Sequence, residues 1–403
     1  MSRMLQGTVC LPGSKSESNR ALMIAAYGGF PLEVDGLSDA HDTVLLKTLL
    51  EDSSSKANVD CEDAGTVARF MLTYLADKPG DWLLTGTERL CQRPMAPLID
   101  ALRQLGASVT SLRAERSGAR QPEGSSTEGR KSTGLSLPLQ IEGHSIEGGP
   151  VTLDASQSSQ FASSLLLAAP TWERGLQLTL TGNPASMPYL EMTIKMMEYF
   201  GIQVNRNGNQ ITVEHQVYQP RPFTVSADWS AASYWYEMLA VSDGGELLLK
   251  GLAEQSLQGD AIVAEWFKPF GINSTFEPQG ARLTKRVQET PQHLVFDFTN
   301  HPDLFPAVYA TCAALQVDAV FKGTENLSIK ESDRLEALKT ELAKVPADVS
   351  SPMPVFNTYG DHRIAMALAS LWPKIGSITV DNPSVVNKSY PGFWEEMKKL
   401  NWD

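Results

Sequence analysis

The chain has 403 residues and a formal net charge of −13, with 42% hydrophobic and 20% charged residues. This length exceeds the roughly 100–200 residues typical of one domain, so we expect two domains or one large repeated architecture. The acidic balance argues against general binding to nucleic acid or to an anionic membrane, because both depend on many lysines and arginines. No apolar run approaches the roughly 18–20 residues of a membrane-spanning helix, and the start lacks a secretory-signal pattern, so we expect a cytoplasmic protein.

Six segments share one pattern, in which a polar start rich in small residues runs directly into an apolar helical stretch. They occupy residues 13–27, 63–76, 156–169, 228–241, 302–315 and 360–372. Each is followed by a second, amphipathic segment, at residues 42–50, 98–109, 192–204, 261–272, 335–345 and 393–400. In the fifth of these, Leu335, Leu338, Leu342 and Val345 recur at spacings of three and four, which predicts one apolar face of a helix.

Short β-rich runs lie between the helical segments. In residues 203–215, the pair Asn207-Gly208 predicts the turn of a β-hairpin between alternating apolar residues. Dividing 403 residues by six gives about 67 per repeat, the size of a small α/β module rather than of a solenoid repeat. The sequence therefore predicts an α/β protein with two domains of three modules each.

One insertion, residues 117–134, is rich in glycine, serine and charge and has no apolar periodicity. This composition predicts a solvated loop. Contact of its cations Arg120, Arg130 and Lys131 with a ligand is the alternative.

Cysteine and histidine spacing does not support a metal site. The four cysteines are far apart and form no C-x-x-C pair, so we expect reduced thiols; they are Cys10, Cys61, Cys91 and Cys312. No metal-ligand spacing connects His41, His144, His215, His293 and His301. The chain also lacks a G-x-x-x-x-G-K-[ST] loop, a G-x-S-x-G elbow and an H-E-x-x-H motif, so we expect neither a metal nor a cofactor.

The polar helix starts are suited to binding anions, because unpaired N–H groups and the helix dipole favour negative charge there. The first start adds the cations Lys15 and Arg20, for which solvated surface positions are the alternative. The third presents Ser156, Ser158, Ser159 and Gln160, groups suited to a polyhydroxylated or phosphorylated ligand. Capping of the helix by these serines is an equally good interpretation.

Further cations follow near the C-terminal end. Lys330 and Arg334 are four residues apart, a spacing that predicts one helix face, and an ion-pair ladder with Glu331 and Asp333 is the alternative. Arg363 follows Asp361 and His362 at the last polar helix start. We interpret seven cations in an acidic protein as two anion subsites in one cleft: Lys15, Arg20, Arg93, Lys330, Arg334, Arg363 and Lys388.

Two carboxylates are candidates for proton transfer. Asp303 precedes the fifth apolar helical stretch, and Glu331 lies among the cations. Both positions are also favourable for capping or charging a helix start, so that structural role is the alternative.

The motifs along the full length of the chain resemble those of the EPSP synthase (3-phosphoshikimate 1-carboxyvinyltransferase) family of enolpyruvyl transferases. The matching stretches, in the family's order, are LPGSKSESNRAL, DAGTVAR, TGTERLCQRPM, SQSSQF, SMPYLEMT, NHPDLFPA, NLSIKESDRL, TYGDHRIAM and NKSYPGF. The resemblance implies an α/β fold of two domains, each with three βαβαββ units around a pseudo-threefold axis and with the active site between them. It implies a discontinuous domain 1, residues 1–13 and 227–403, and a domain 2, residues 14–226.

The resemblance also implies the reaction: the enolpyruvyl group of phosphoenolpyruvate passes to the 5-hydroxyl of shikimate 3-phosphate, and phosphate is released without a metal. It implies shikimate 3-phosphate contacts at Lys15, Ser16, Arg20, Ser158, Ser159, Gln160, Ser186, Tyr189, Asp303, Asn326 and Lys330. It implies phosphoenolpyruvate contacts at Lys15, Gly65, Arg93, Gln160, Arg334, Arg363 and Lys388. Asp303 near the hydroxyl and Glu331 near the methylene carbon would transfer protons, with Lys15 as a third catalytic residue.

The chain departs from the family pattern at Asp63, usually Asn, at Ala68, usually Met, and at Trp229, usually a small residue. Because Gly65 and Arg93 are present, the resemblance implies that glyphosate inhibits the enzyme. The departures at Asp63 and Ala68 would affect how strongly it does so. One alternative is the sister enzyme acting on UDP-N-acetylglucosamine, which is disfavoured because its loop cysteine would fall at Glu88. The other is a non-catalytic binder of a phosphorylated ligand. For the enzyme that the resemblance implies, we expect a monomer whose partners are the small molecules shikimate 3-phosphate and phosphoenolpyruvate.

Overall fold

The computed structural model describes residues 4–52, 57–113, 135–286, 291–346 and 352–402. The chain divides into two compact units. Unit 1 comprises Met1–Ser18, Val34–Val44 and Phe223–Asp403, and unit 2 comprises Asn19–Glu33 and Leu45–Pro222. The chain passes from one unit to the other at four points, and two of these lie within the helices α1 (Lys15–Gly28) and α2 (His41–Asp52).

Three sheets repeat one strand order. In unit 2 they are β3-β4-β6-β5 and β7-β8-β10-β9, and in unit 1 the order β1-β12-β14-β13 recurs with β19 added beside β1. In each, the first two strands are parallel and the next two pairs are antiparallel, with helices between the strands along the chain. This is the predicted βαβαββ order. The remaining modules contain the parallel pairs β2/β11, β15/β16 and β17/β18.

The strands of unit 2 are β3 (Asn58–Asp60), β4 (Gly80–Thr85), β5 (Ser108–Ser111), β6 (Leu139–Gly143), β7 (Gly149–Asp154), β8 (Leu176–Thr181), β9 (Asn205–Asn207) and β10 (Gln210–Val213). Its further helices are α3 (Gly65–Ala76), α4 (Glu88–Gln92), α5 (Ala96–Gln104), α7 (Ser159–Ala168), η1 (Ala169–Thr171) and α8 (Met187–Tyr199). The predicted hairpin forms, but its turn residues are Gly208 and Asn209, one position later than predicted, because Asn207 pairs with Gln210. Gly208 has a φ of 58°, a conformation that glycine adopts without strain.

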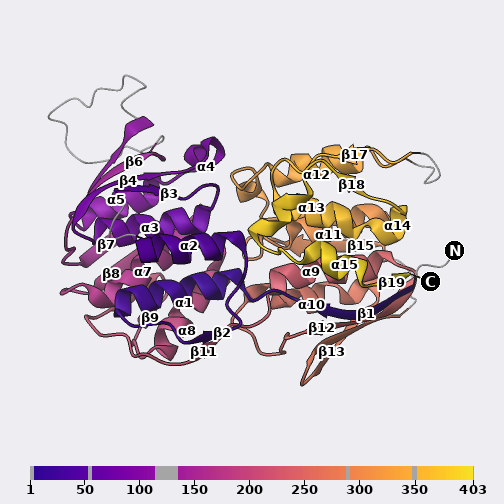
Figure 1. Cartoon of the computed structure of the whole chain (residues 1–403), viewed down its shortest axis with the longest axis horizontal. Helices are drawn as coiled ribbons and strands as arrows, with labels where there is room; N and C mark the ends of the chain where they lie inside the picture. Colours follow the sequence, from indigo (N-terminus) through magenta and orange to yellow (C-terminus); the bar gives the residue numbers. More distant parts are fainter. Residues whose placement is uncertain (1–3, 53–56, 114–134, 287–290, 347–351, 403) are drawn as a thin grey trace. The chain divides into compact units, whose positions relative to one another are not determined.

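The strands of unit 1 are β1 (Met4–Cys10), β2 (Val34–Asp35), β11 (Phe223–Thr224), β12 (Gly244–Lys250), β13 (Ile272–Glu277), β14 (Gly280–Lys285), β15 (His293–Asp297), β16 (Asp318–Lys322), β17 (Val355–Phe356), β18 (Thr379–Val380) and β19 (Asn401–Trp402). Its helices are α9 (Trp229–Val241), η2 (Gly259–Ile262), α10 (Val263–Trp266), η3 (Lys268–Phe270), α11 (Phe305–Leu315), η4 (Glu325–Leu327), α12 (Arg334–Leu342), α13 (His362–Ser370), α14 (Trp372–Ile375), η5 (Pro383–Lys388) and α15 (Phe393–Lys398). Figure 1 shows these elements along the chain.

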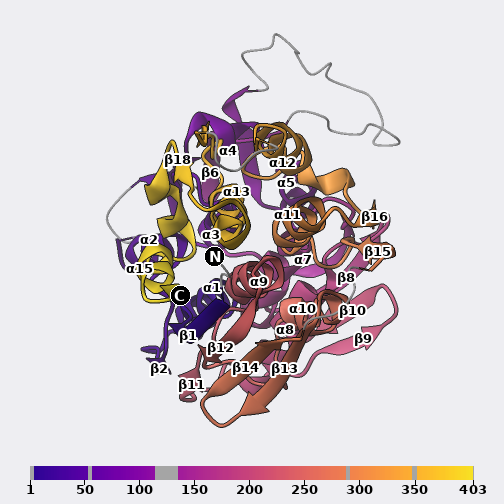
Figure 2. The same ribbon diagram turned by 90° about the vertical axis from the view of Figure 1, so that its right-hand side faces the viewer.

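The six predicted polar starts all lead into helices, namely α1, α3, α7, α9, α11 and α13. Every residue of α13 is buried, as are nearly all residues of α3, α7 and α9, because their apolar side chains surround the whole helix. In unit 1, α9, α11 and α13 pack against one another at the centre of the core, and Figure 2 shows them nearly end-on. The polar starts of these helices therefore carry polar side chains into a mostly apolar interior.

The fifth amphipathic segment is shorter as a helix than predicted. The helix α12 ends at Leu342, so Val345 lies beyond it, although it still packs against the core together with Leu335 and Leu342. The insertion at residues 117–134, including Arg120, Arg130 and Lys131, lies outside the described residues.

Candidate active site

Arg334 is the central cation of a charged cluster in unit 1. It is the first residue of α12 and is only 1% exposed. Its guanidinium donates to Asp303 at 3.0 Å, to Glu331 at 2.9 Å and to Asp361 at 2.9 Å. Burial would lower the pKa of Arg334, but these three carboxylates outweigh it and raise the pKa. A buried guanidinium with three fixed partners is a rigid donor for an anion.

The predicted shared helix face of Lys330 and Arg334 is wrong. Because α12 begins at Arg334, Lys330 lies before the helix. Asp333 caps this helix by accepting from the N–H of Glu336. Glu331 instead directs its carboxylate to Arg334, so the capping interpretation of Glu331 does not hold. The sequence thus identified the charged residues of this segment but misplaced the start of the helix.

Asp303 lies two residues before α11, whose N-cap is Leu304 and has no side-chain cap. Its carboxylate pairs with Arg334 at 3.0 Å and with Arg363 at 2.9 Å, and its backbone carbonyl accepts from Arg363 at 3.3 Å. Burial would raise the pKa of Asp303, but the cations Arg363, Lys330 and Arg334 outweigh it and hold the pKa well below its usual range. Asp303 is therefore an ionised carboxylate held between two arginines, and the capping alternative is wrong.

The start of α13 holds both arginines in place. Asp361 is fully buried and caps the helix by accepting from the N–H of Arg363 at 2.9 Å. Its other oxygen accepts from Arg334 Nε at 2.9 Å and from the hydroxyl of Ser332 at 3.0 Å. The neighbouring His362 is buried, and burial with the nearby cations Lys15 and Arg363 lowers its pKa well below the usual value. His362 is therefore a neutral imidazole at the edge of this cluster.

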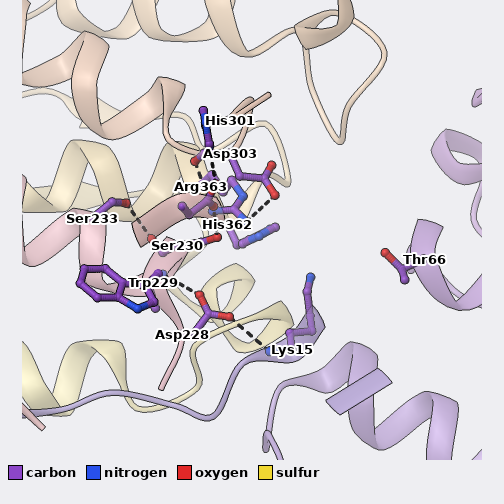
Figure 3. A network of polar contacts seen from close by, with 12 residues as sticks. Lys15, Thr66, Asp228, Trp229, Ser230, Ser233, His301, Asp303, His362 and Arg363 are labelled. Carbon is purple, nitrogen blue, oxygen red and sulfur yellow. Dashed lines mark hydrogen bonds and ion pairs between the residues drawn. The ribbon is translucent and has the colours of Figure 1, made fainter. Parts of the chain in front are cut away.

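Lys15 and Lys388 share a carboxylate that sequence reasoning missed. Lys15 Nζ is 2.8 Å and Lys388 Nζ is 3.3 Å from opposite oxygens of Asp42, which is only 2% exposed. Burial would raise the pKa of Asp42, but the two lysines outweigh it and lower the pKa. The backbone N–H of Lys15 donates to Asp228, the N-cap of α9. Figure 3 shows Lys15 and Asp228 joined in this way, with Asp303, His362 and Arg363 grouped nearby.

Arg20 is a buried residue of unit 2 rather than a surface cation. It is 1% exposed and lies over the ring of Phe70. Its guanidinium donates to the hydroxyl of Thr193 at 2.7 Å, to the hydroxyl of Ser163 at 3.3 Å and to the carbonyl of Tyr189 at 3.1 Å. Its role toward a substrate phosphate remains a prediction.

A second group in unit 2 surrounds the start of α3. Arg69 donates to the amide oxygen of Gln160 at 2.8 Å, and the Gln160 amide nitrogen donates to the Thr66 hydroxyl at 2.9 Å. A Cβ atom at Gly65 would lie 2.5 Å from Arg93 Nη1 and 2.8 Å from Arg69 Nη1. Glycine at this position lets both guanidinium groups approach the helix start.

Among the predicted serines, Ser158 caps α7 by accepting from the N–H of Gln160 at 3.2 Å, so the capping interpretation holds for this residue. Ser159 is buried in the first turn of that helix. Ser186 precedes α8 with a φ of 58°, uncommon for a residue other than glycine, and its side chain makes no cap. Asn326 lies in η4 of unit 1, and Ser16 lies in the first turn of α1.

The sequence missed Asp42, Arg69 and the side-chain role of Asp361. Arg69 had a readable signal, because it follows a polar helix start just as Arg20 does. The sequence places Asp361 at a helix start but does not indicate which side chains it contacts. Nothing in the local sequence connects Asp42 with Lys388. Within the described ranges, no group of three or more His, Cys, Asp or Glu side chains could hold a metal ion, and no helix is long and apolar enough to cross a membrane.

Comparison with known proteins agrees with the resemblance read from the motifs. The sequence model of the family described as EPSP synthase (3-phosphoshikimate 1-carboxyvinyltransferase) matches residues 44–118 and 121–397. A protein of Bacteroides fragilis named 3-phosphoshikimate 1-carboxyvinyltransferase is 40% identical over an alignment of 416 residues that covers 99% of this chain and 96% of the relative. A protein of the same name from Methanospirillum hungatei JF-1 is 32% identical, with 98% and 96% covered.

A solved structure of EPSP synthase from Acinetobacter baumannii matches with a TM-score of 0.71 and 20% sequence identity. The match covers 100% of this chain and 98% of the other, which confirms the predicted fold class. The chain belongs to the EPSP synthase (3-phosphoshikimate 1-carboxyvinyltransferase) family.

Proposed function

We propose that this chain transfers the enolpyruvyl group of phosphoenolpyruvate to the 5-hydroxyl of shikimate 3-phosphate and releases phosphate. The observation that carries the proposal is the contact of one buried guanidinium, Arg334, with both candidate proton-transfer carboxylates, Asp303 and Glu331. Membership of the family supplies the substrates and the reaction.

The cations of unit 1 bind phosphoenolpyruvate. Arg334 and Arg363 suit a phosphate or carboxylate group because guanidinium presents paired N–H donors, and Lys15 and Lys388 add point charges. We assign Gly65, Arg93 and Gln160 to the same substrate. In the transition state these donors stabilise the charge on the phosphate that is leaving, which is the largest electrostatic requirement of the reaction.

The reaction breaks the C–O bond between the enolpyruvyl carbon and phosphate, so protons must move to and from carbon. The 5-hydroxyl oxygen attacks C2 of phosphoenolpyruvate and loses its proton, while the methylene carbon C3 gains one. The resulting tetrahedral adduct then loses phosphate from C2 and a proton from C3. Asp303 is ionised at neutral pH and accepts the hydroxyl proton, Glu331 exchanges the proton at C3, and Lys15 assists.

We assign shikimate 3-phosphate to hydroxyl, amide and cationic side chains: Lys15, Ser16, Arg20, Ser158, Ser159, Gln160, Ser186, Tyr189, Asp303, Asn326 and Lys330. The buried guanidinium of Arg20, which donates to the hydroxyls of Thr193 and Ser163, supports this assignment in unit 2. Domain boundaries near residues 13 and 227, a monomeric state and a cytoplasmic location belong to the same proposal.

One assay tests the proposed function. Purified protein is incubated with phosphoenolpyruvate and either shikimate 3-phosphate or UDP-N-acetylglucosamine, and phosphate release is measured. We expect phosphate release in the reaction with shikimate 3-phosphate and none in the reaction with UDP-N-acetylglucosamine. Release only with UDP-N-acetylglucosamine would assign the chain to the sister reaction, and binding of shikimate 3-phosphate without phosphate release would indicate a non-catalytic binder.

A further inference from the structure

The turn before α13 has an unusual backbone. Tyr359 has a φ of 53° and the next residue, Gly360, a φ of 66°, so two successive residues adopt left-handed conformations. Glycine does this freely, but a tyrosine does so only where its surroundings stabilise it. The turn leads directly into Asp361, the cap of α13 and the partner of Arg334.

The stabilising group is Glu341, a fully buried carboxylate near the end of α12. Its Oε1 accepts from the hydroxyl of Tyr359 at 2.8 Å, and its Oε2 accepts from the backbone N–H of Asn357 at 2.9 Å. Within the turn, the N–H of Tyr359 donates to Asn357 Oδ1 at 2.7 Å. Tyr359 is 40% exposed, but the partial burial of its hydroxyl together with the Glu341 carboxylate raises its pKa, so the hydroxyl stays protonated and can donate.

The same helix therefore holds this loop at two points. At its first residue, Arg334 donates to Asp361, and seven residues later Glu341 accepts from Asn357 and Tyr359. Asp361 in turn accepts from the N–H of Arg363. The separation between the two arginines thus depends on how the turn is anchored to α12.

We propose that Glu341 and Tyr359 are positioning residues that fix the start of α13, and through it Arg334 and Arg363, for binding of phosphoenolpyruvate. This inference rests on the proposed function, because that function assigns the two arginines to phosphoenolpyruvate. Neither Glu341 nor Tyr359 touches substrate in this proposal. Their effect passes through Asp361.

An ion pair is the competing explanation of the buried Glu341 carboxylate. Lys344 Nζ lies 2.7 and 2.6 Å from its two oxygens, three residues along the chain and just beyond the end of α12. If Glu341 serves only this pair, then its contacts to the turn are incidental. Lys344 therefore offers a matched control: Lys344→Met and Tyr359→Phe each remove one donor from the same carboxylate, but only Tyr359→Phe removes a contact between the turn and α12.

The experiment compares steady-state kinetics, shikimate 3-phosphate binding by calorimetry and melting temperature in the wild type and these two variants. We expect Tyr359→Phe to raise the KM for phosphoenolpyruvate about threefold to tenfold, the range that corresponds to the net contribution of one hydrogen bond. We expect little change in the dissociation constant of shikimate 3-phosphate, and a normal KM in Lys344→Met. Equal KM values in both variants would overturn the inference.

A double-mutant cycle gives a second readout. In a Glu341→Leu background, which has no acceptor for the Tyr359 hydroxyl, the further change Tyr359→Phe should alter the KM for phosphoenolpyruvate by much less than it does in the wild type, because the contact between the two side chains is already lost. Fully additive effects would contradict the inference. A wild-type protein without phosphate release would instead contradict the proposed function, so the two failures are distinguishable.

Discussion

Glu237 is a fully buried acid in the middle of α9, a costly position for a carboxyl group. Neither carboxylate oxygen has a hydrogen-bond partner among the described residues. Burial raises the pKa of Glu237 well above its usual value, so the folded protein holds it as a neutral acid. Unfolding lets it ionise near its ordinary value. Its contribution to stability is therefore greatest at acid pH and falls as pH rises toward the raised pKa of the folded state.

Glu237→Gln should therefore stabilise the protein more at pH 8 than at pH 5, because glutamine does not ionise in the unfolded chain. The free energy of unfolding, measured with denaturant at both pH values, tests this. The exposed residue Glu254 provides the control, since Glu254→Gln should give the same small change at both values. A Glu237→Gln effect that does not depend on pH would show that the acid is not neutral in the folded state.

Asp303→Asn should reduce turnover about 10²–10⁴-fold, the usual contribution of a general acid or base. The variant should remain folded, because Arg334 keeps its pairs with Glu331 and Asp361. Phosphate release and melting temperature are measured on one preparation. Near-normal turnover with a lowered melting temperature would show that the carboxylate is only a structural partner of the two arginines.

At the scale of elements, one residue at the start of α7 has both a structural role and a proposed binding role. Ser158 caps the helix and is assigned to shikimate 3-phosphate. Ser158→Ala should cost about 0.5–2 kcal/mol of stability through the lost cap and should also weaken ligand binding. Ser158→Asp keeps a good cap but places a negative charge beside the ligand phosphate. We therefore expect Ser158→Asp to retain the melting temperature and to bind shikimate 3-phosphate more weakly than Ser158→Ala. Equal binding of all three proteins would place the ligand elsewhere.

The sequence predicted the elements better than it predicted their contacts. The six polar starts gave the positions of α1, α3, α7, α9, α11 and α13, because a small polar segment before a long apolar run is a local signal. The start of α12 was misplaced, because Asp333 competes with nearby Ser332 and Ser328 as a cap and only the folded chain selects one. Asp42 could not be connected with Lys388, since 346 residues separate them and no local pattern records a tertiary ion pair.

At the scale of the whole molecule, an acidic protein with a net charge of −13 is proposed to bind two anionic substrates. It can do so only where cations are concentrated locally, because long-range charge repels both substrates. Five of the seven predicted cations already have carboxylate or hydroxyl partners among the described residues: Lys15 and Lys388 pair with Asp42, Arg334 and Arg363 pair with Asp303, and Arg20 donates to the hydroxyl of Thr193. A bound substrate must therefore join or replace these existing ion pairs and hydrogen bonds, because the protein does not offer it a uniformly positive surface.

Hydrogen exchange measured by mass spectrometry tests which segments of the chain contact the bound substrate. The residues assigned to shikimate 3-phosphate include Ser158–Gln160 of unit 2 and both Asn326 and Lys330 of unit 1. Shikimate 3-phosphate alone should therefore slow amide exchange in peptides from both units, because a bound ligand suppresses local opening where it makes contact. Peptides covering the hairpin β9–β10, to which no ligand contact is assigned and whose strand β9 is exposed, serve as the internal control and should not change. Protection confined to one unit would contradict the assignment of ligand contacts in the other, and protection that also reaches the hairpin would indicate general stabilisation instead of local contact.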